Sequence, residues 1–354
     1  MFSSGYIEAR SRLRRAADRH ALRVSEYRHP QPGPDGQSLT TDVVHIGPRD
    51  ASTVVVVNSG THGVEGFLGS AVQQRILDRS LWSRAPNDVR WVLIHALNPW
   101  GYAWLRRVTE DNVDLNRNFI DFGGALPANE EYAALADALA PADLDPSTLM
   151  KADQVLWGFA ERIGQPKLQE IITRGQYDHP DGLYFGGQRP SWSAETFRQI
   201  LRNELSNATR VFLVDVHTGL GSYGAAEIIV EFPRNSGVYE RAKQIWGDRV
   251  RSTVDGESLS PHLSGAIDHC LVDRLPDAVV TPVALEVGTR SPLQVLQALR
   301  SDNWLHTRGD PRGPTATQIK EQIRDAFYPD EDTWRERVMG FGARALDDLL
   351  DVLA

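Results

Sequence analysis

Apolar, β-branched runs that end in short polar turns constrain the fold of this chain more than any other feature. Six segments have this character and predict β-strands: 41–47, 53–60, 89–99, 210–219, 226–232 and 278–289. Between the second and the third of them, residues 66–77 show the helical spacing of apolar side chains. Strands that alternate with helices favour an α/β sheet in which neighbouring strands run parallel.

The other segments with helical character surround these strands or interrupt them. They are 5–27, 130–140, 151–162, 166–174, 194–206, 236–246, 315–327 and 332–353. Because strand runs flank residues 125–205 on both sides, we interpret this mostly helical stretch as an insertion that walls off a cleft. The prediction is a single α/β domain over residues 1–354, with a mixed, mostly parallel central sheet flanked by helices.

Composition excludes several functional classes. The formal net charge of −9 argues against a nucleic-acid partner, since such proteins usually carry a basic face. Cys270 is the only cysteine, so the chain has neither an internal disulfide nor a cysteine-rich zinc site. The start of the chain lacks the apolar core of a secretory signal, and no window is apolar enough to span a membrane. We therefore expect a cytoplasmic protein; its oligomeric state stays open.

The turn after the strand at 53–60 carries the first candidate for chemistry. It reads "NSGTHGVEGF" and places His62 three residues before Glu65, a spacing that puts both side chains on one side of a helical turn. Gly60 and Gly63 permit a tight backbone path. Imidazole and carboxylate groups both suit zinc, although the pattern alone is a weak signal and favours an ordinary loop histidine.

A second histidine ends the strand run "VFLVDVHTG". Ligand sites in open α/β sheets form beyond the carboxyl ends of the strands, where His217 and His62 both lie. A catalytic zinc needs three protein ligands and one open position, and His62, Glu65 and His217 supply such a set. The sequence therefore predicts one zinc ion per chain. The alternative is a pair of unrelated turn histidines.

A carboxylate interrupts the last strand run, "VALEVGT". Burial of a lone carboxylate costs free energy unless the group is paired or neutralised, so Glu286 needs a reason to be there. One reason is the role of a general base beside the metal. The alternative is an edge strand on which Glu286 faces solvent.

The segment "LRRVTEDNVDLNRNF" collects polar side chains after the strand at 89–99. Among them are Arg106, Arg107, Asn116 and Arg117. Guanidinium groups bind carboxylates with two parallel hydrogen bonds, which makes this segment a candidate anchor for an acidic substrate. A solvated loop is the alternative that such a composition also allows.

Five stretches in this order resemble the zinc carboxypeptidase family. They are "NSGTHGVEGFLGS", "NPWGYAWLRRVTEDNVDLNRNF", "GQYDHPDGLYFGG", "DVHTGLGSYG" and "LEVGT". They look most like a bacterial subgroup of carboxypeptidase-like hydrolases, near the aspartoacylase and succinylglutamate desuccinylase branch. The resemblance spans roughly residues 40 to 345 and implies a zinc carboxypeptidase-like fold.

The resemblance implies a role for each matching residue at the metal. His62, Glu65 and His217 match the zinc ligands of the family. Glu286 matches the general base that activates water and later protonates the leaving amine. Asp114 matches the carboxylate that orients the first histidine ligand, a function that metal sites generally require.

Five further residues are candidates for contact with the substrate, four of them through the resemblance. Asn116 and Arg117 match the pair that grips a substrate carboxylate. Arg107 matches the arginine that stabilises the oxyanion as water attacks the carbonyl, with its neighbour Arg106 as the second choice and a candidate contact to substrate. Tyr184 in the insertion is a candidate substrate contact as well.

One departure from the family concerns a tyrosine that peptide-cleaving members place a little over twenty residues before the general base. This chain has no tyrosine between Tyr239 and Glu286. His262, Tyr177 or Tyr184 are the candidates to cap the substrate in its place. The departure favours small amides over ordinary peptides.

The sequence thus predicts a zinc-dependent hydrolase that cleaves an amide bond in a small substrate with a free carboxylate. That substrate is an N-acyl amino acid or the C-terminus of a peptide. One alternative is a metallocarboxypeptidase that acts on ordinary peptides. An alternative of another class is a non-catalytic binding protein on the same fold.

Overall fold

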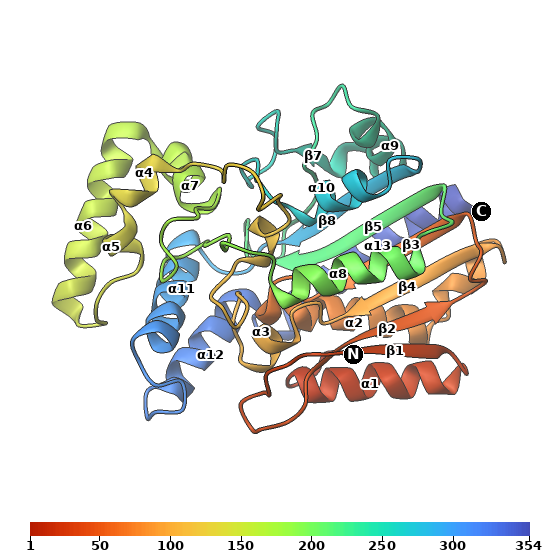
Figure 1. The fold of residues 1–354 in the computed structure, drawn as a ribbon, viewed down its shortest axis with the longest axis horizontal. Coiled ribbons are helices and arrows are strands. Elements are labelled where there is room, and N and C mark those ends of the chain that lie inside the picture. Colours follow the sequence, from red (N-terminus) through yellow and green to blue (C-terminus); the bar gives the residue numbers. More distant parts are fainter.

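One eight-stranded sheet with helices on both faces forms the centre of the molecule, and the computed structural model describes all 354 residues (Figure 1). The strands are β1 (Arg23–Arg28), β2 (Thr40–Ile46), β3 (Thr53–Ser59), β4 (Val89–His95), β5 (Arg210–Thr218), β6 (Ala226–Val230), β7 (Val250–Ser252) and β8 (Val279–Val287). Their order in the sheet is β1-β2-β4-β3-β5-β8-β6-β7. The pairs β3·β4, β3·β5, β5·β8 and β6·β7 are parallel, and the other three are antiparallel. The predicted class, a mixed and mostly parallel α/β sheet, is confirmed.

Thirteen α-helices surround this sheet. They are α1 (Tyr6–Arg19), α2 (Gly66–Asp78), α3 (Pro99–Ala103), α4 (Glu130–Ala133), α5 (Ala136–Leu139), α6 (Pro146–Ile163), α7 (Gln165–Thr173), α8 (Trp192–Glu204), α9 (Gly237–Trp246), α10 (Ile267–Arg274), α11 (Pro292–Thr307), α12 (Ala316–Phe327) and α13 (Asp332–Leu353). None of them combines the length and the apolar character that crossing a membrane requires.

The helix predicted over residues 5–27 is wrong in its last third. The helix ends at Arg19, and Ala21 has a positive φ of 52°, which an α-helix cannot contain. The chain then forms β1, an edge strand paired antiparallel with β2. The apolar side chains Ala21 and Val24, which had extended the helical pattern, belong to the turn and the strand.

The two faces of the sheet bury different helices. Along β3, Val55 and Val57 join a large core with helices such as α1, α2 and α13, whereas Val54 and Val56 join a smaller core with α8 and α10. This follows from the period of two in a strand, which sends alternate side chains to opposite faces. The continuous apolar runs of the sequence are therefore strands covered on both sides.

Residues 125–205 contribute to two places in the fold. Helix α8 packs on the sheet through Ala194, Phe197 and Ile200. Helices α4 to α7 lie instead beyond the carboxyl ends of β5 and β8, beside α11 (Figure 1). This end of the sheet is where both predicted histidine ligands are found.

Candidate metal centre

The three predicted metal ligands come from two neighbouring parallel strands. His62 follows β3, Glu65 closes a short 3₁₀ turn over Gly63–Glu65, and His217 lies near the end of β5. Gly60 has a φ of +70°, and a side chain on Gly63 would lie 2.1 Å from the backbone of Gly101. Both glycines are therefore required by the turn that directs His62 and Glu65 toward one point.

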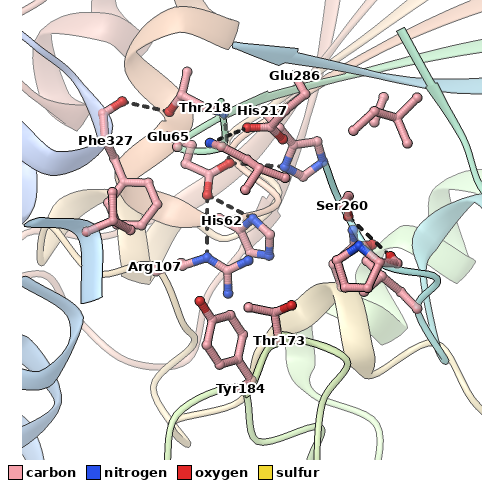
Figure 2. Close-up of a pocket in the computed structure, with 18 of the residues that line it drawn as sticks. His62, Glu65, Arg107, Thr173, Tyr184, His217, Thr218, Ser260, Glu286 and Phe327 are labelled. Atoms are coloured by element: carbon pink, nitrogen blue, oxygen red, sulfur yellow. Dashed lines mark hydrogen bonds and ion pairs between the residues drawn. The ribbon is translucent and has the colours of Figure 1, made fainter. Parts of the chain in front are cut away.

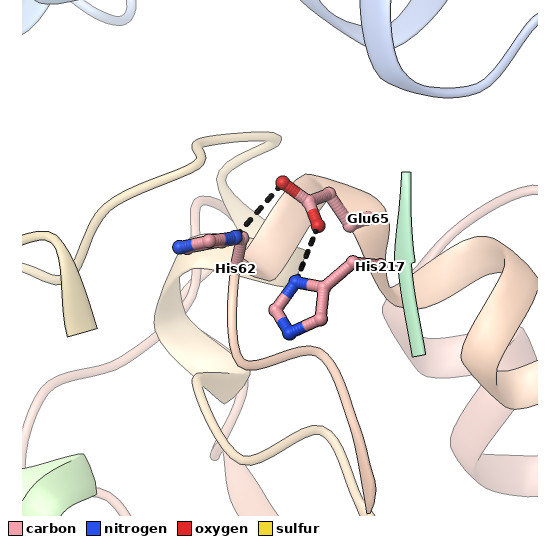
Figure 3. A group of neighbouring side chains, drawn as sticks. All are labelled: His62, Glu65 and His217. Carbon is pink, nitrogen blue, oxygen red and sulfur yellow. Dashed lines mark hydrogen bonds and ion pairs between the residues drawn. The ribbon is translucent and has the colours of Figure 1, made fainter. Parts of the chain in front are cut away.

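The ligand atoms of these residues converge. Atoms from His62, Glu65 and His217 all lie within 4.8 Å of one another, and the three residues are buried. The Nδ1 atom of His62 is 2.9 Å from one Glu65 oxygen, and the Nδ1 atom of His217 is 3.0 Å from the other (Figure 3). The structure therefore brings the three predicted residues together at one point.

A carboxylate holds the far nitrogen of each imidazole ring. His62 Nε2 donates to Asp114 at 2.9 Å, and His217 Nε2 donates to Asp215 at 2.7 Å. These bonds leave each Nδ1 lone pair directed at the centre, as in metal sites where a carboxylate orients the histidine. Asp114 had been predicted for this role. Asp215 was missed, although a residue two positions before His217 on a strand must face the same side.

The donor set fits a divalent cation. His62 Nδ1 is a buried nitrogen without a hydrogen-bond partner of acceptable geometry, despite its contact with Glu65. Four carboxyl groups but only two guanidinium groups surround the ligand atoms: Glu65, Asp114, Asp215 and Glu286 against Arg107 and Arg117. Nitrogen and oxygen ligands in such acidic surroundings match zinc and related ions.

The centre opens into a cavity of about 120 Å³. Figure 2 shows the side chains of His62, Glu65, Arg107, Tyr184 and Glu286 around this space. Its wall contains eight of the predicted site residues: His62, Glu65, Arg107, Asn116, Arg117, Tyr184, His217 and Glu286. The cavity therefore brings together groups that lie as far apart in the chain as residues 62 and 286.

Glu286 lies on β8, which is an interior strand between β5 and β6. The alternative of an edge strand with Glu286 facing solvent is therefore wrong. Its backbone neighbour on β5 is His217, and its carboxylate accepts a hydrogen bond from the backbone N–H of Leu220 at 3.0 Å. Burial, and next the negative charge of Glu65, raise the pKa of Glu286 to about 8.

The two arginines of the cavity differ in how many donors they keep free. Arg107 donates to Asp114 and lies 3.6 Å from Glu65. Three N–H groups of Arg117 donate to the carbonyl oxygens of Thr173 and Asn116, which leaves two of its five N–H groups without a protein partner. The Asn116 side-chain oxygen accepts from the backbone of α10, and its amide nitrogen makes no bond within the protein.

Arg106 does not reach this cavity. It is buried, its Nε donates to Asp302 at 2.9 Å and a second nitrogen donates to Asn112 at 3.0 Å. The prediction of Arg106 as a contact to substrate is therefore wrong. Its guanidinium group is committed to an ion pair with a residue of α11, which sequence analysis had not recognised as a helix.

Of the three candidates for the missing tyrosine, only Tyr184 lines the cavity. Its ring lies under Arg107, 5.1 Å from the guanidinium carbon, and under Arg117 at 5.8 Å. Tyr177 is buried elsewhere and donates to the carbonyl of Arg117. His262 is half-exposed beside Glu231 and lies outside the wall.

Tyr184 has a backbone φ of +55°, which is rare for a residue with a side chain. Strained residues of this kind cost about 1–3 kcal/mol and are concentrated at functional sites. Here the strain is retained at a residue that covers two arginines beside the metal ligands.

The sheet and its helices have the carboxypeptidase-like α/β fold. Carboxypeptidase A from Helicoverpa armigera matches with a TM-score of 0.50 at 13% identity, over 93% of this chain and 75% of that chain. Bovine thrombin-activatable fibrinolysis inhibitor gives 0.49 at 11% identity, over 97% and 98% of the two chains. A succinylglutamate desuccinylase from Silicibacter sp. TM1040 gives 0.42 at 13%, over 86% and 65%. The expected resemblance is confirmed for the fold, which is all that such identities establish.

Within that fold class, the chain belongs to the family described as "Protein of unknown function (DUF2817)", which it matches over residues 2–340. The match begins well before residue 40, where the predicted resemblance started. No curated protein matches the chain. The family description assigns no activity, so an inference about function depends on the groups in the cavity.

Proposed function

We propose that this protein is a zinc-dependent hydrolase that cleaves an amide bond in a small substrate with a free carboxylate. The observation that carries the proposal is the convergence of His62, Glu65 and His217 on one point at the wall of a cavity that also contains Glu286. Three ligands and adjoining open space are the requirement of a catalytic zinc site, whereas a structural site has four ligands.

Zinc held by His62, Glu65 and His217 would polarise the scissile carbonyl and lower the pKa of water to about 7. Glu286 takes a proton from the attacking water and returns it to the departing amine. The raised pKa of Glu286 suits both transfers, because a base works best when its pKa lies near the working pH. The hydrogen bond from Leu220 holds one of its oxygens in place.

The arginines and the tyrosine bind the substrate. Arg107, whose charge faces the cavity beside Glu65, stabilises the negative charge that develops on the carbonyl oxygen. The free donors of Arg117 and the amide of Asn116 bind the substrate carboxylate. Tyr184 covers this end of the cavity.

Two alternative functions, a carboxypeptidase for ordinary peptides and a non-catalytic binding protein, fit the cavity less well. Tyr184 and Thr173 from residues 125–205 border the cavity and restrict the space at the metal ligands, which favours a small substrate over an ordinary peptide. A non-catalytic binding protein would have no need to keep Glu286 buried beside Glu65, where the pKa is perturbed. Both observations favour a hydrolase of small molecules.

The test has two parts. Protein purified without chelators is analysed for metal, and we expect one zinc ion per chain. The zinc-loaded protein is then assayed for amine release from a panel of N-acyl amino acids and short peptides, with Glu286→Gln as the blank. Hydrolysis of acyl amino acids by the wild type alone supports the proposal.

The opposing results are equally specific. Absence of stoichiometric metal would favour a binding protein. Faster cleavage of peptides than of acyl amino acids would favour the carboxypeptidase alternative. Activity that survives in Glu286→Gln would refute the role of this residue.

A further inference from the structure

A second, larger cavity adjoins the metal centre. It has a volume of about 390 Å³, compared with about 120 Å³ for the space at the ligands. The two share part of their walls: Gln169, Thr173, Tyr184, Gly219, Leu220 and Val295. The second cavity is therefore a continuation of the first, and we name it the distal cavity.

The lining of the distal cavity is mostly apolar, with nine hydrophobic residues among sixteen. Leu156, Leu168 and Ile172 of α6 and α7 form a buried floor. Trp157 of α6 is 54% exposed and Leu293 of α11 is 45% exposed, and both belong to its lining. Exposed large apolar side chains around a hollow are typical of a binding site for an apolar ligand.

The distal cavity contains no cationic side chain. Its one charged residue is Asp153, whose carboxylate accepts a hydrogen bond from Arg300 at 2.5 Å. A second carboxylate of a substrate would find no partner here, and its desolvation would be costly. A substrate with a charged acyl group, such as a succinyl amide, is therefore disfavoured.

The position of the distal cavity beside the metal cavity decides which part of a substrate enters it. In the proposed function Arg117 and Asn116 hold the carboxylate within the metal cavity, and Glu286 marks the scissile bond. The distal cavity continues past Tyr184 and Leu220, and its lining includes neither Asn116 nor Arg117. A volume of about 120 Å³ leaves little room for more than the amino acid portion, so the acyl group has to extend into the distal cavity.

We propose that the distal cavity binds the aliphatic acyl chain of an N-acyl amino acid. This inference rests on the proposed function and names its substrate class. The reaction adds water across the amide bond: the hydroxyl joins the acyl carbon to give a fatty carboxylic acid, and the proton goes to nitrogen to give the free amino acid. The residues of α6, α7 and α11 then select for chain length.

Binding measurements test the inference apart from catalysis. Calorimetry with zinc-loaded Glu286→Gln compares N-acetyl-, N-hexanoyl- and N-decanoyl-alanine. Each methylene group that enters the cavity should tighten binding roughly fourfold until the cavity is filled. We expect the decanoyl compound to bind at least about a hundredfold more tightly than the acetyl compound.

Variants of the lining test whether the preference for a long acyl chain arises in the distal cavity. Trp157→Ser and Leu293→Ser are both made in the Glu286→Gln background. Each should reduce the ratio of the affinities for the decanoyl and acetyl compounds about tenfold, because each removes exposed apolar surface from the lining. Val155→Ser is the matched control: Val155 lies on the same helix, is 42% exposed and does not line the cavity. Melting curves of all variants check that they fold.

The two proposals fail in different ways. Equal affinity for the three ligands, or a loss in Val155→Ser as large as in Trp157→Ser, would overturn the acyl-chain inference. Amine release by the wild type from the acetyl compound, without any preference for longer chains, would support the hydrolase function and contradict binding of the acyl chain in the distal cavity. Binding that depends on chain length, without any amine release by the wild type, would support the distal cavity as a site for acyl chains and contradict the hydrolase function.

Discussion

Arg106 and Arg107 are neighbours in the chain but belong to two buried polar clusters of opposite character. Arg107 joins the metal centre, where ligand atoms of Glu65, His62 and His217 converge at the wall of a cavity. Arg106 joins a cluster in which donors and acceptors meet directly. The comparison shows that a buried charged group does not by itself indicate a functional site.

The Arg106 cluster is closed. Asp302 accepts from Arg106 at 2.9 Å and from Lys320 at 2.5 Å, and Lys320 donates to His306 at 2.7 Å. Burial, and next the charge of Arg106, lower the pKa of His306 to about 2, so this ring is neutral. The space beside Arg106 and Asp302 amounts to about 20 Å³. Such a cluster ties α11 and α12 to the loop and leaves no ligand a place.

The metal centre is open in the sense that its ligand atoms converge at the wall of a cavity. The negative charge of Glu65 contributes to the raised pKa of Glu286, and a cation bound between the ligands would offset that charge. A closed cluster thus contributes to stability, and an open one to binding. Substitutions in the two clusters should affect different measurements.

The largest effect is expected for Glu286→Gln in the open cluster. The amide keeps the shape of the side chain but cannot take a proton, so kcat should fall about 10²–10⁴-fold. Metal content should be unchanged, because Glu286 is not among the converging ligands. Amine release and metal analysis on the same preparation measure both. A variant that loses its metal would show that Glu286 is a ligand instead.

In the closed cluster, Asp302→Asn should cost stability. It leaves Arg106 and Lys320 buried without their shared counter-charge, and breaking a buried pair typically costs about 3–5 kcal/mol. Urea unfolding near neutral pH measures the loss, and metal content should stay at the wild-type level. Asp277→Asn is the control, since Asp277 is exposed and makes no hydrogen bond or ion pair. A loss of metal without a loss of stability would contradict the division between the clusters.

A smaller effect is expected for Asp215→Asn in the open cluster. Asp215 accepts from His217, and also from Asn58 and Thr61, so an amide disturbs the orientation of a proposed ligand. Removing such a partner typically weakens metal affinity about 10–100-fold.

A buried aspartate nearby serves as the control for Asp215→Asn. Burial, and next the charge of Glu231, raise the pKa of Asp268 well above its usual value, so Asp268→Asn hardly alters the local charge. Competition with a chelator of known affinity compares the two variants. Equal losses in both would show that Asp215 acts only through general packing.

Most of the open cluster could be predicted from the sequence because its residues end strand runs. His62, His217 and Glu286 stand where apolar runs give way to polar or glycine residues, and parallel strands bring such ends together. Asp215 could have been predicted as well, because side chains two residues apart on a strand face the same side and Asp215 lies two residues before His217.

The closed cluster could not be predicted in the same way. Arg106 and its partner Asp302 lie 196 positions apart, and no local pattern links them. Arg106 and Arg107 lie in a loop, and a loop has no regular periodicity from which the direction of each side chain could be predicted. Helix α11 did carry a readable signal: Ser291 and Gln294 form a capping box, with Pro292 at the first turn.

The smallest effect is a pH dependence confined to the closed cluster. Although burial raises the pKa of Asp302, the charges of Lys320 and Arg106 outweigh it and lower the pKa to about 2, from 3.8 in the unfolded chain. The lowered value means that the unfolded chain binds the proton first, so this contribution to stability is present above about pH 4 and is lost as pH falls toward 2.

The stability difference between wild type and Asp302→Asn should therefore shrink by about 1 kcal/mol between about pH 6 and about pH 3. Urea unfolding of the pair at both values measures it, and the exposed control Asp277→Asn should show no such change. A difference that stays constant would mean that folding leaves the pKa of Asp302 unshifted, and a difference that grows as the pH falls would mean that Asp302 is protonated in the folded protein. In the second case the cluster would be held by neutral hydrogen bonds, and its contrast with the metal centre would be one of geometry alone.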